Sequence, residues 1–199
     1  DPIVAFFDRR AGVYDRQLPL ERAALEAAAA LAEPLAGARV VDLAAGRGAL
    51  SAALVARSPS IPALTLIDAS PRMLALAGRR VSGHVGRTSF LLADVRRTPL
   101  ADGCADVVGI GYLLHLLDPE PRRAVLAEAL RILRPGGTLV IVVHGSPGGI
   151  VGRLYRSAWK AIGRPMPRSV LGAPMTGLAE TVVAAGFHVA TAGRLRGVY

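Results

Sequence analysis

The chain has 199 residues, of which 52% are hydrophobic and 20% charged, so it can bury a sizeable core in one domain and is not disordered. Its formal net charge of +9 is almost wholly arginine, a pattern that fits a GC-rich genome as well as it fits an anionic partner. The lone cysteine, Cys104, excludes an internal disulfide and disfavours a zinc cluster, and no apolar run reaches the ~18 residues of a membrane span. We therefore expect a cytoplasmic protein without a bound metal.

Short apolar runs rich in β-branched residues alternate with helical patterns, which predicts a parallel sheet with crossover helices. A helical cap is expected over residues 1–36, with an amphipathic helix at 20–35. The strands expected next are 38–44, 63–69, 89–94, 105–111, 138–144 and 187–192, and the helices between them are 49–57, 71–81, 120–133 and 177–185. Ser70 and Thr176 are the expected N-caps of the second and last of these helices, and Pro135-Gly136-Gly137 is expected to end the third.

The end of the first strand carries a glycine turn. Residues 40–48 read Val-Val-Asp-Leu-Ala-Ala-Gly-Arg-Gly. Gly46 and Gly48 allow a tight turn and a close approach of the backbone to a ligand, and the following helix points free N–H groups at it. Alone, such a turn is also compatible with an ordinary strand-to-helix connection.

The next two strand ends each supply a carboxylate. Asp68 follows the glycines by about twenty residues, where it can accept hydrogen bonds from both ribose hydroxyls. The alternative for Asp68 is a charge that balances a helix dipole. Asp94 can accept from the exocyclic amino group of adenine while Val95 offers its backbone N–H. Because ligands of open α/β sheets bind beyond the carboxyl ends of the strands, the three ends predict a nucleoside site.

These motifs resemble those of the class I S-adenosylmethionine (SAM)-dependent methyltransferases. They are Val-Val-Asp-Leu-x-x-Gly-x-Gly, Ile-Asp-x-Ser-x-x-Met-Leu and Ala-Asp-Val, followed by Arg-Ile-Leu-Arg-Pro-Gly-Gly-Thr-Leu at 131–139. Phe7-Asp8 and Tyr14-Asp15 are similar to the ubiquinone/menaquinone C-methyltransferase-like branch. The resemblance covers roughly residues 6 to 145. It implies an α/β, Rossmann-like, mostly parallel seven-stranded sheet with helices on both faces, of which six strands are recognisable in the sequence and the last need not be covered by it. The sheet is expected in a single domain over 1–199 with a substrate lid at about 145–175.

The resemblance also implies SAM as cofactor and S-adenosylhomocysteine as product. Residues 42–48 would hold the methionine part, Asp68 the ribose, and Asp94 with Val95 the adenine edge. The implied cofactor-binding residues are Asp42, Ala44, Gly46, Gly48, Asp68, Ala69, Met73, Asp94, Val95 and Tyr14. One position departs from the family, which usually has glycine where Ala44 stands. The extra Cβ either is accommodated or crowds the carboxylate of SAM.

A nicotinamide dehydrogenase competes on the same architecture. Its fingerprint needs a third glycine where this chain has Ser51, and it asks neither for Asp42 nor for the Arg-Pro-Gly-Gly turn.

Candidate catalytic residues follow the fourth and fifth strands. They are Tyr112, His115 and His144. Methyl transfer is an in-line displacement that depends on positioning, and a histidine with a pKa near ~6.5 suits an acceptor that must lose a proton. The alternative for each histidine is a hydrogen-bonded structural role. No Asn/Asp-Pro-Pro-aromatic motif follows the fourth strand, and Cys104 precedes that strand, so a nucleic-acid acceptor is not expected.

The stretch from 145 to 175 is expected to select the acceptor. Apolar residues recur at helical spacing over 150–162, with basic residues on the other face, so this helix either covers the substrate pocket or lies on a membrane surface. Both readings favour a small lipophilic or lipid-linked acceptor, with peripheral membrane contact in the second. Two alternatives stay open, a phospholipid amine N-methyltransferase at an anionic membrane and a SAM-binding protein without catalysis. The sequence gives no indication of the oligomeric state.

Overall fold

A five-stranded parallel sheet forms the centre of the protein in a computed structural model, which describes residues 2–14, 18–32, 35–84, 86–144 and 175–193. The strands are β1 (Arg39–Leu43), β2 (Ala63–Asp68), β3 (Arg87–Leu92), β4 (Ala105–Gly111) and β5 (Leu133–Val142), in the spatial order β3-β2-β1-β4-β5. The chain passes from β1 to β2 and β3 on one side of β1, and β4 and β5 lie on the other side. The carboxyl end of β1 is therefore the switch point at which such sheets bind ligands.

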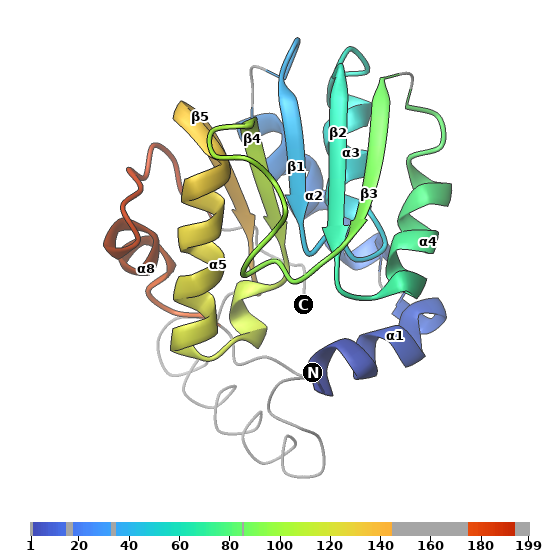
Figure 1. The fold of residues 1–199 in the computed structure, drawn as a ribbon, viewed down its shortest axis with the longest axis horizontal. Helices are drawn as coiled ribbons and strands as arrows, with labels where there is room; N and C mark the ends of the chain where they lie inside the picture. Colours follow the sequence, from blue (N-terminus) through green and yellow to red (C-terminus); the bar gives the residue numbers. More distant parts are fainter. Residues whose placement is uncertain (1, 15–17, 33–34, 85, 145–174, 194–199) are drawn as a thin grey trace.

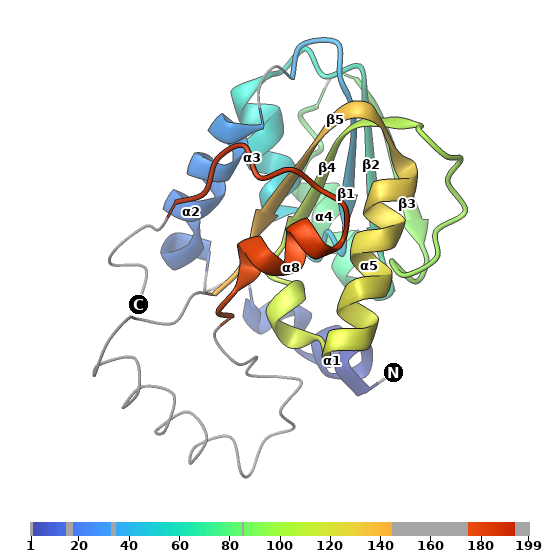
Figure 2. The ribbon, with the colours of Figure 1, turned by 90° about the vertical axis from the view of Figure 1, so that its left-hand side faces the viewer.

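Helices cover both faces of the sheet (Figures 1 and 2). On one face lie α2 (Leu18–Leu31), α3 (Ala49–Arg57) and α4 (Pro71–Arg80), and on the other lie α5 (Pro119–Ile132) and α8 (Leu178–Ala184). A short 3-10 helix, η2 (Leu114–Leu116), precedes α5, and α1 (Pro2–Tyr14) lies against α4 beneath the carboxyl edge of the sheet.

Because both faces are covered, the central strands β1, β2 and β4 are largely apolar and buried, whereas the edge strand β3 begins with Arg-Thr-Ser. Val40 packs in the core on the α3 side, with Leu54, and Val41 packs in the core on the α5 side, with Val125.

The order of elements confirms the sequence predictions as far as β5. Helix 49–57 and strand 105–111 have the expected bounds, and the other elements up to residue 142 differ by a few residues at their ends. Ser70 caps α4 as expected, since its Oγ accepts the N–H of Met73 at 3.1 Å and Pro71 takes the first helical position.

Three predictions were wrong. The expected strand 187–192 pairs with no other strand in the described part of the chain; the N–H of Phe187 bonds back to Val182 of α8. Of the seven strands that the resemblance implies, five lie in the described part of the chain. Thr176 does not cap α8, because Gly177 takes that place at φ 71° without a side-chain bond. Residues 135–137 lie within β5 instead of ending the helix, since α5 stops at Ile132 and β5 begins at Leu133. The pairing with β4 jumps from Leu133 to Thr138, so residues 134–137 form an irregularity in β5.

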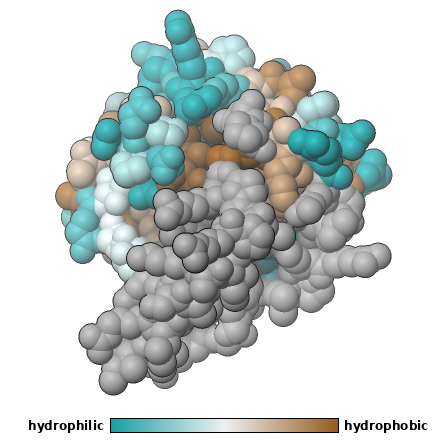
Figure 3. Space-filling view, turned by 90° about the horizontal axis from the view of Figure 1, so that it is seen from below, coloured by the Kyte–Doolittle hydropathy of each residue, from teal (hydrophilic) through white to brown (hydrophobic). Residues whose placement is uncertain are grey.

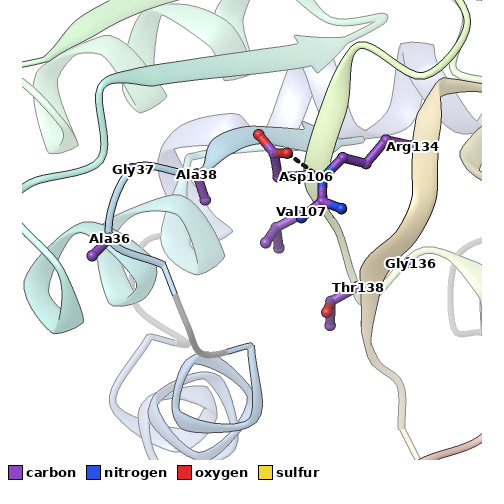
Figure 4. A pocket seen from close by; sticks show the side chains of 8 residues that line it. All are labelled: Ala36, Gly37, Ala38, Asp106, Val107, Arg134, Gly136 and Thr138. Atoms are coloured by element: carbon purple, nitrogen blue, oxygen red, sulfur yellow. Dashed lines mark hydrogen bonds and ion pairs between the residues drawn. The ribbon is translucent and has the colours of Figure 1, made fainter.

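The amino edge of the sheet is fastened by Asp106 of β4. Its carboxylate accepts the backbone N–H and the Nε of Arg39 at 2.8 Å each, and the Nε of Arg134 at 2.5 Å. These guanidinium groups, led by Arg39, hold the pKa of Asp106 well below its usual range. A cavity of about 200 Å³ opens beside this cluster (Figure 4). It lies at the edge opposite the predicted site, as does a neighbouring cavity of about 350 Å³ between Leu130 and His188.

None of the described helices is long and apolar enough to span a bilayer.

Candidate functional site

The glycine turn after β1 is bonded to the end of β2. The N–H of Ala45 donates to the carbonyl of Ile67 at 2.9 Å, and the N–H of Gly46 donates to Asp68 Oδ2 at 2.8 Å. With these bonds made, Ala44 has a φ of 57°, in the left-handed region that costs a residue with a Cβ ~1–2 kcal/mol. The alanine that departs from the family pattern is thus held in a strained backbone conformation.

Gly48, in contrast, leaves no room for a side chain. It has a φ of 75° at the N-cap of α3, and a Cβ there would lie 3.0 Å from the Cα and Cβ of Ala77 on α4. The first turn of α3 is thereby brought close to α4, with its N–H groups facing the carboxyl edge of the sheet.

Asp42 lies buried under this turn, on the α3 side of β1. Its Oδ2 accepts the N–H of Ser51 at 3.1 Å and the Oγ–H of Ser51 at 2.6 Å, which fixes the start of α3 on the strand. Oδ1 is buried and has no hydrogen-bond partner among the described residues. Burial, only partly offset by the bonds from Ser51, raises the pKa of Asp42 to about 7.

Asp68 organises the two turns beside it. Its Oδ2 holds Gly46 and its Oδ1 accepts the N–H of Ser70 at 2.8 Å. Burial raises the pKa of Asp68, and the hydrogen bonds from Ser70 and Gly46 oppose that rise. The backbone N–H of Ala69 also donates to this carboxylate, so about one of its four acceptor sites stays open to a further donor. Ala69 beside it is exposed, and Met73 is buried one turn into α4.

Asp94 follows β3 as predicted, but its carboxylate is already engaged. Arg96 donates to it through Nε at 2.9 Å and Nη2 at 2.6 Å, and this lowers the pKa of Asp94. An adenine amino group would have to share the carboxylate with that guanidinium. Val95 is half-buried and packs against the α5-side core.

Two further contacts were not found by sequence reasoning. Arg47, between the two glycines, forms a buried ion pair with Glu21 of α2. Burial raises the pKa of Glu21 despite this partner. The available signal was a glutamate at the start of an alanine- and leucine-rich helix whose second glutamate, Glu26, pairs with Arg22 on the same helix. Asp8 of α1 accepts the Oγ–H of Ser70 at 2.6 Å, so the helix is tied to the turn after β2. Nothing is described of the Tyr14 side chain.

The three candidate catalytic side chains come together beyond β4 and β5. The ring of His144 lies between the other two, with its centroid 4.6 Å from Tyr112 and 4.7 Å from His115. Tyr112 has a φ of 55°, and its N–H donates to the carbonyl of Val142 at 2.7 Å. A bulky residue in this backbone conformation is strained, and such strain is common at functional sites.

The two histidines differ in burial and hence in basicity. Burial first, and His144 second, lower the pKa of His115 to about 3, and its Nδ1 is buried without a hydrogen-bond partner in the described part of the chain. Burial also lowers the pKa of His144, which is the more exposed of the two. Both imidazoles are therefore neutral at pH 7, and His144 is the better proton acceptor.

Apolar surface gathers at the same edge of the sheet. Figure 3 views this edge from below and shows hydrophobic side chains in its middle, between hydrophilic margins. Leu113, Leu116 and Leu117, which are half-buried, follow Tyr112 on the β4–α5 connection. The expected lid over 145–175 lies outside the described residues except for Met175, whose N–H donates to the carbonyl of His144 at 2.9 Å.

Comparison with known proteins gives the following. Residues 40–137 match the family described as "Methyltransferase domain". A demethylmenaquinone methyltransferase of Clavibacter sepedonicus is 36% identical over 166 residues, which are 80% of this chain and 65% of the relative. A malonyl-[acyl-carrier protein] O-methyltransferase of Pectobacterium atrosepticum is 31% identical over 86% of this chain and 65% of its own length. The chain thus spans less than two thirds of either relative.

A solved structure shows the same fold. An O-methyltransferase family protein from Burkholderia thailandensis superposes with a TM-score of 0.75 at 24% identity, over 93% of this chain and 56% of that one.

Proposed function

Since the chain belongs to the class I SAM-dependent methyltransferases, with ubiquinone/menaquinone C-methyltransferase-like relatives, we propose that it transfers a methyl group from SAM to a small lipophilic or lipid-linked acceptor. The observation that carries the proposal is the cluster of Tyr112, His115 and His144, which lies with apolar surface at the edge where the cofactor residues gather. A lipid-linked acceptor implies peripheral contact with a membrane.

The residues present fit SAM. Beside its three backbone donors Asp68 keeps acceptor capacity for a ribose hydroxyl, and the buried Asp42 Oδ1 lacks a partner among the described residues, on the strand next to the glycine turn. The N–H groups at the start of α3 suit the methionine carboxylate. Gly46, Gly48 and the left-handed Ala44 bring this backbone close to the ligand. When bound, SAM supplies an electrophilic methyl group.

His144 is the residue we assign as the base. A neutral imidazole can accept the proton that an acceptor hydroxyl, amine or activated carbon loses, whereas the pKa of about 3 makes His115 a weak base. His115 and Tyr112 contact the His144 ring on either side and so fix its orientation. In this proposal they position the base.

The relatives support two acceptor classes. One relative is named for demethylmenaquinone and another for malonyl-acyl carrier protein, so lipophilic and carrier-linked acceptors both occur among similar chains. The apolar middle of the carboxyl edge fits either one. Phospholipid amines are the runner-up because they too combine an apolar tail with a nucleophilic head.

Calorimetry with SAM and with NAD tests the cofactor. We expect micromolar SAM binding, no NAD binding, and at least a tenfold loss in Asp68→Asn. Asp102→Asn is the matched control, because Asp102 is an exposed carboxylate paired with Arg131, on the connection between β3 and β4. A wild-type protein that binds no SAM would overturn the proposal.

Transfer of labelled methyl groups tests the acceptor and the base. The candidates are hydroquinones, malonyl-acyl carrier protein and phosphatidylethanolamine. We expect His144→Gln to lower kcat by ~10²–10⁴-fold with unchanged SAM affinity, and Tyr112→Phe to have a smaller effect. SAM binding without transfer to any acceptor would favour the non-catalytic alternative.

A further inference from the structure

A continuous set of hydrogen bonds runs from the N-terminal helix to the glycine turn. Asp8 Oδ1 accepts the Oγ–H of Ser70 at 2.6 Å, and the same Ser70 donates its backbone N–H to Asp68 at 2.8 Å. Asp68 in turn holds Gly46 at 2.8 Å. One serine thus links α1, which lies below the sheet, to the carboxylate assigned to the ribose.

The Ser70 side chain has its two roles fixed by its neighbours. It is buried, its hydroxyl proton is directed to Asp8, and its oxygen accepts the N–H of Met73. Asp8 strengthens this arrangement with a bond at 3.3 Å from the N–H of Arg72 and an ion pair with the Arg72 guanidinium at 3.6 Å. The bond from Ser70 is the main cause that lowers the pKa of Asp8, so Asp8 is a carboxylate at pH 7 and its bonds are charge-assisted.

The hydrogen bonds of Asp8 hold α1 next to the predicted nucleoside site. The helix packs against α4 and lies beneath the ends of β2 and β3, where the ribose and adenine would sit (Figure 1). A helix docked in this way limits the escape of a bound nucleoside, and the turn that docks it also carries Asp68.

We propose that Asp8 is a positioning residue that couples docking of α1 to cofactor binding, by holding the Ser70 turn in the geometry that Asp68 needs. The inference rests on the proposed function. Because coupling between two equilibria is reciprocal, SAM should favour docked α1 by the same factor by which docked α1 favours SAM.

Limited trypsin digestion after Arg9, which is exposed on α1, measures docking without reference to activity. In cofactor-free protein we expect Asp8→Asn to be cleaved several-fold faster than wild type. SAM should protect the wild type strongly and Asp8→Asn weakly. Equal cleavage of both proteins without SAM would overturn the inference, whatever SAM does.

Calorimetry measures the coupling itself. We expect Asp8→Asn to weaken SAM binding by about tenfold, the usual effect of losing a hydrogen bond to a charged group, and to raise the KM for SAM with kcat unchanged. Arg72→Gln is the matched control, since it removes the ion pair but keeps the bond from Ser70, and a change below threefold is expected. Faster cleavage with unchanged SAM affinity would show a purely structural contact and would also overturn the inference.

A double variant tests whether Asp8 acts through Ser70. If it does, Asp8→Asn combined with Ser70→Ala binds SAM no more weakly than the weaker of the two single variants. Losses that multiply would contradict the relay. A wild-type protein that binds no SAM would overturn the proposed function, and the coupling with it, while the digestion without cofactor still decides whether Asp8 docks α1.

Discussion

Replacing Ala44 with glycine should stabilise the cofactor-free protein slightly, which is unusual for a change from alanine to glycine. Ala44 has a φ of 57°, which costs an alanine ~1–2 kcal/mol and glycine almost nothing. Glycine loses more backbone entropy on folding, which costs ~0.5–1 kcal/mol. The difference leaves Ala44→Gly more stable by about 0–1.5 kcal/mol.

The neighbouring alanine is the control. Ala45 is buried and does not have a positive φ, so Ala45→Gly relieves no strain. It pays the same entropy and loses one buried methyl group worth ~0.8 kcal/mol, for a total loss of about 1–2 kcal/mol. The two variants should differ by about 2 kcal/mol, or roughly 5 °C in Tm for a domain of this size.

Urea unfolding and calorimetry of the two variants and the wild type measure this difference. Equal destabilisation by Ala44→Gly and Ala45→Gly would refute the reasoning, because it would mean that Ala44 carries no strain. The affinity of Ala44→Gly for SAM is a separate readout. A gain of tenfold or more would show that the Cβ crowds the cofactor, and unchanged affinity would show that it is accommodated.

Three further outcomes are expected. Asp42→Asn should gain stability relative to wild type as the pH rises from about 4 to about 7, and the gain should stay constant above pH 7. The reason is that Asp42 keeps a proton in the folded state up to a pKa of about 7, while the unfolded chain ionises near ~4; a difference in thermal unfolding that does not change over this range would contradict this. Gly48→Ala should lower the free energy of unfolding by ~1–3 kcal/mol more than Gly37→Ala does. Both glycines have a positive φ, but only a Cβ at Gly48 would meet the α4 backbone. Equal losses of stability in urea unfolding would argue against the close approach. Glu128→Gln should destabilise the protein at pH 7. The bond from Arg131 lowers the pKa of Glu128 to about 2 in the folded state, so the loss of stability should shrink as the pH falls from about 4.5 towards 2. A loss that persists at pH 2 would contradict that origin.

The sequence predicted those elements whose pattern is local. Helix 49–57 lies between a glycine turn and a serine, and strand 105–111 is an apolar run buried on both faces, so each pattern determines its own bounds. Residues 187–192 show a similar apolar pattern but do not pair. Strand formation requires a partner with free backbone groups, and a single run of residues does not specify one.

The site was predicted to the extent that topology alone determines it. Parallel strands bring their carboxyl ends to one edge, so the sequence alone groups Asp42, Asp68 and Asp94. The bonds that tune these carboxylates depend on distant residues. Asp8 precedes Ser70 by 62 positions, and no pattern around either residue indicates the contact. The exception is Arg96, only two positions after Asp94, whose pairing could have been anticipated.

The Asp106 cluster places a source of stability at the amino edge of the sheet, away from the carboxyl edge where the chemistry takes place. Stability and activity often trade off against each other in proteins. Asp106 binds Arg39 and Arg134 where the strands begin, and β1 and β4 then run five and seven residues to the ends where the cofactor residues lie. At ~3.3 Å per residue, the six residues from Asp106 to Tyr112 span about 20 Å, beyond the ~7–10 Å over which substitutions usually influence one another. Asp42 lies three residues from Arg39, about 10 Å away, at the limit of that range. Substitutions at Asp106 that raise or lower the stability of the sheet therefore add to those at Tyr112 without interacting with them, so the amino edge can be made more stable while the chemistry beyond the end of β4 is altered independently.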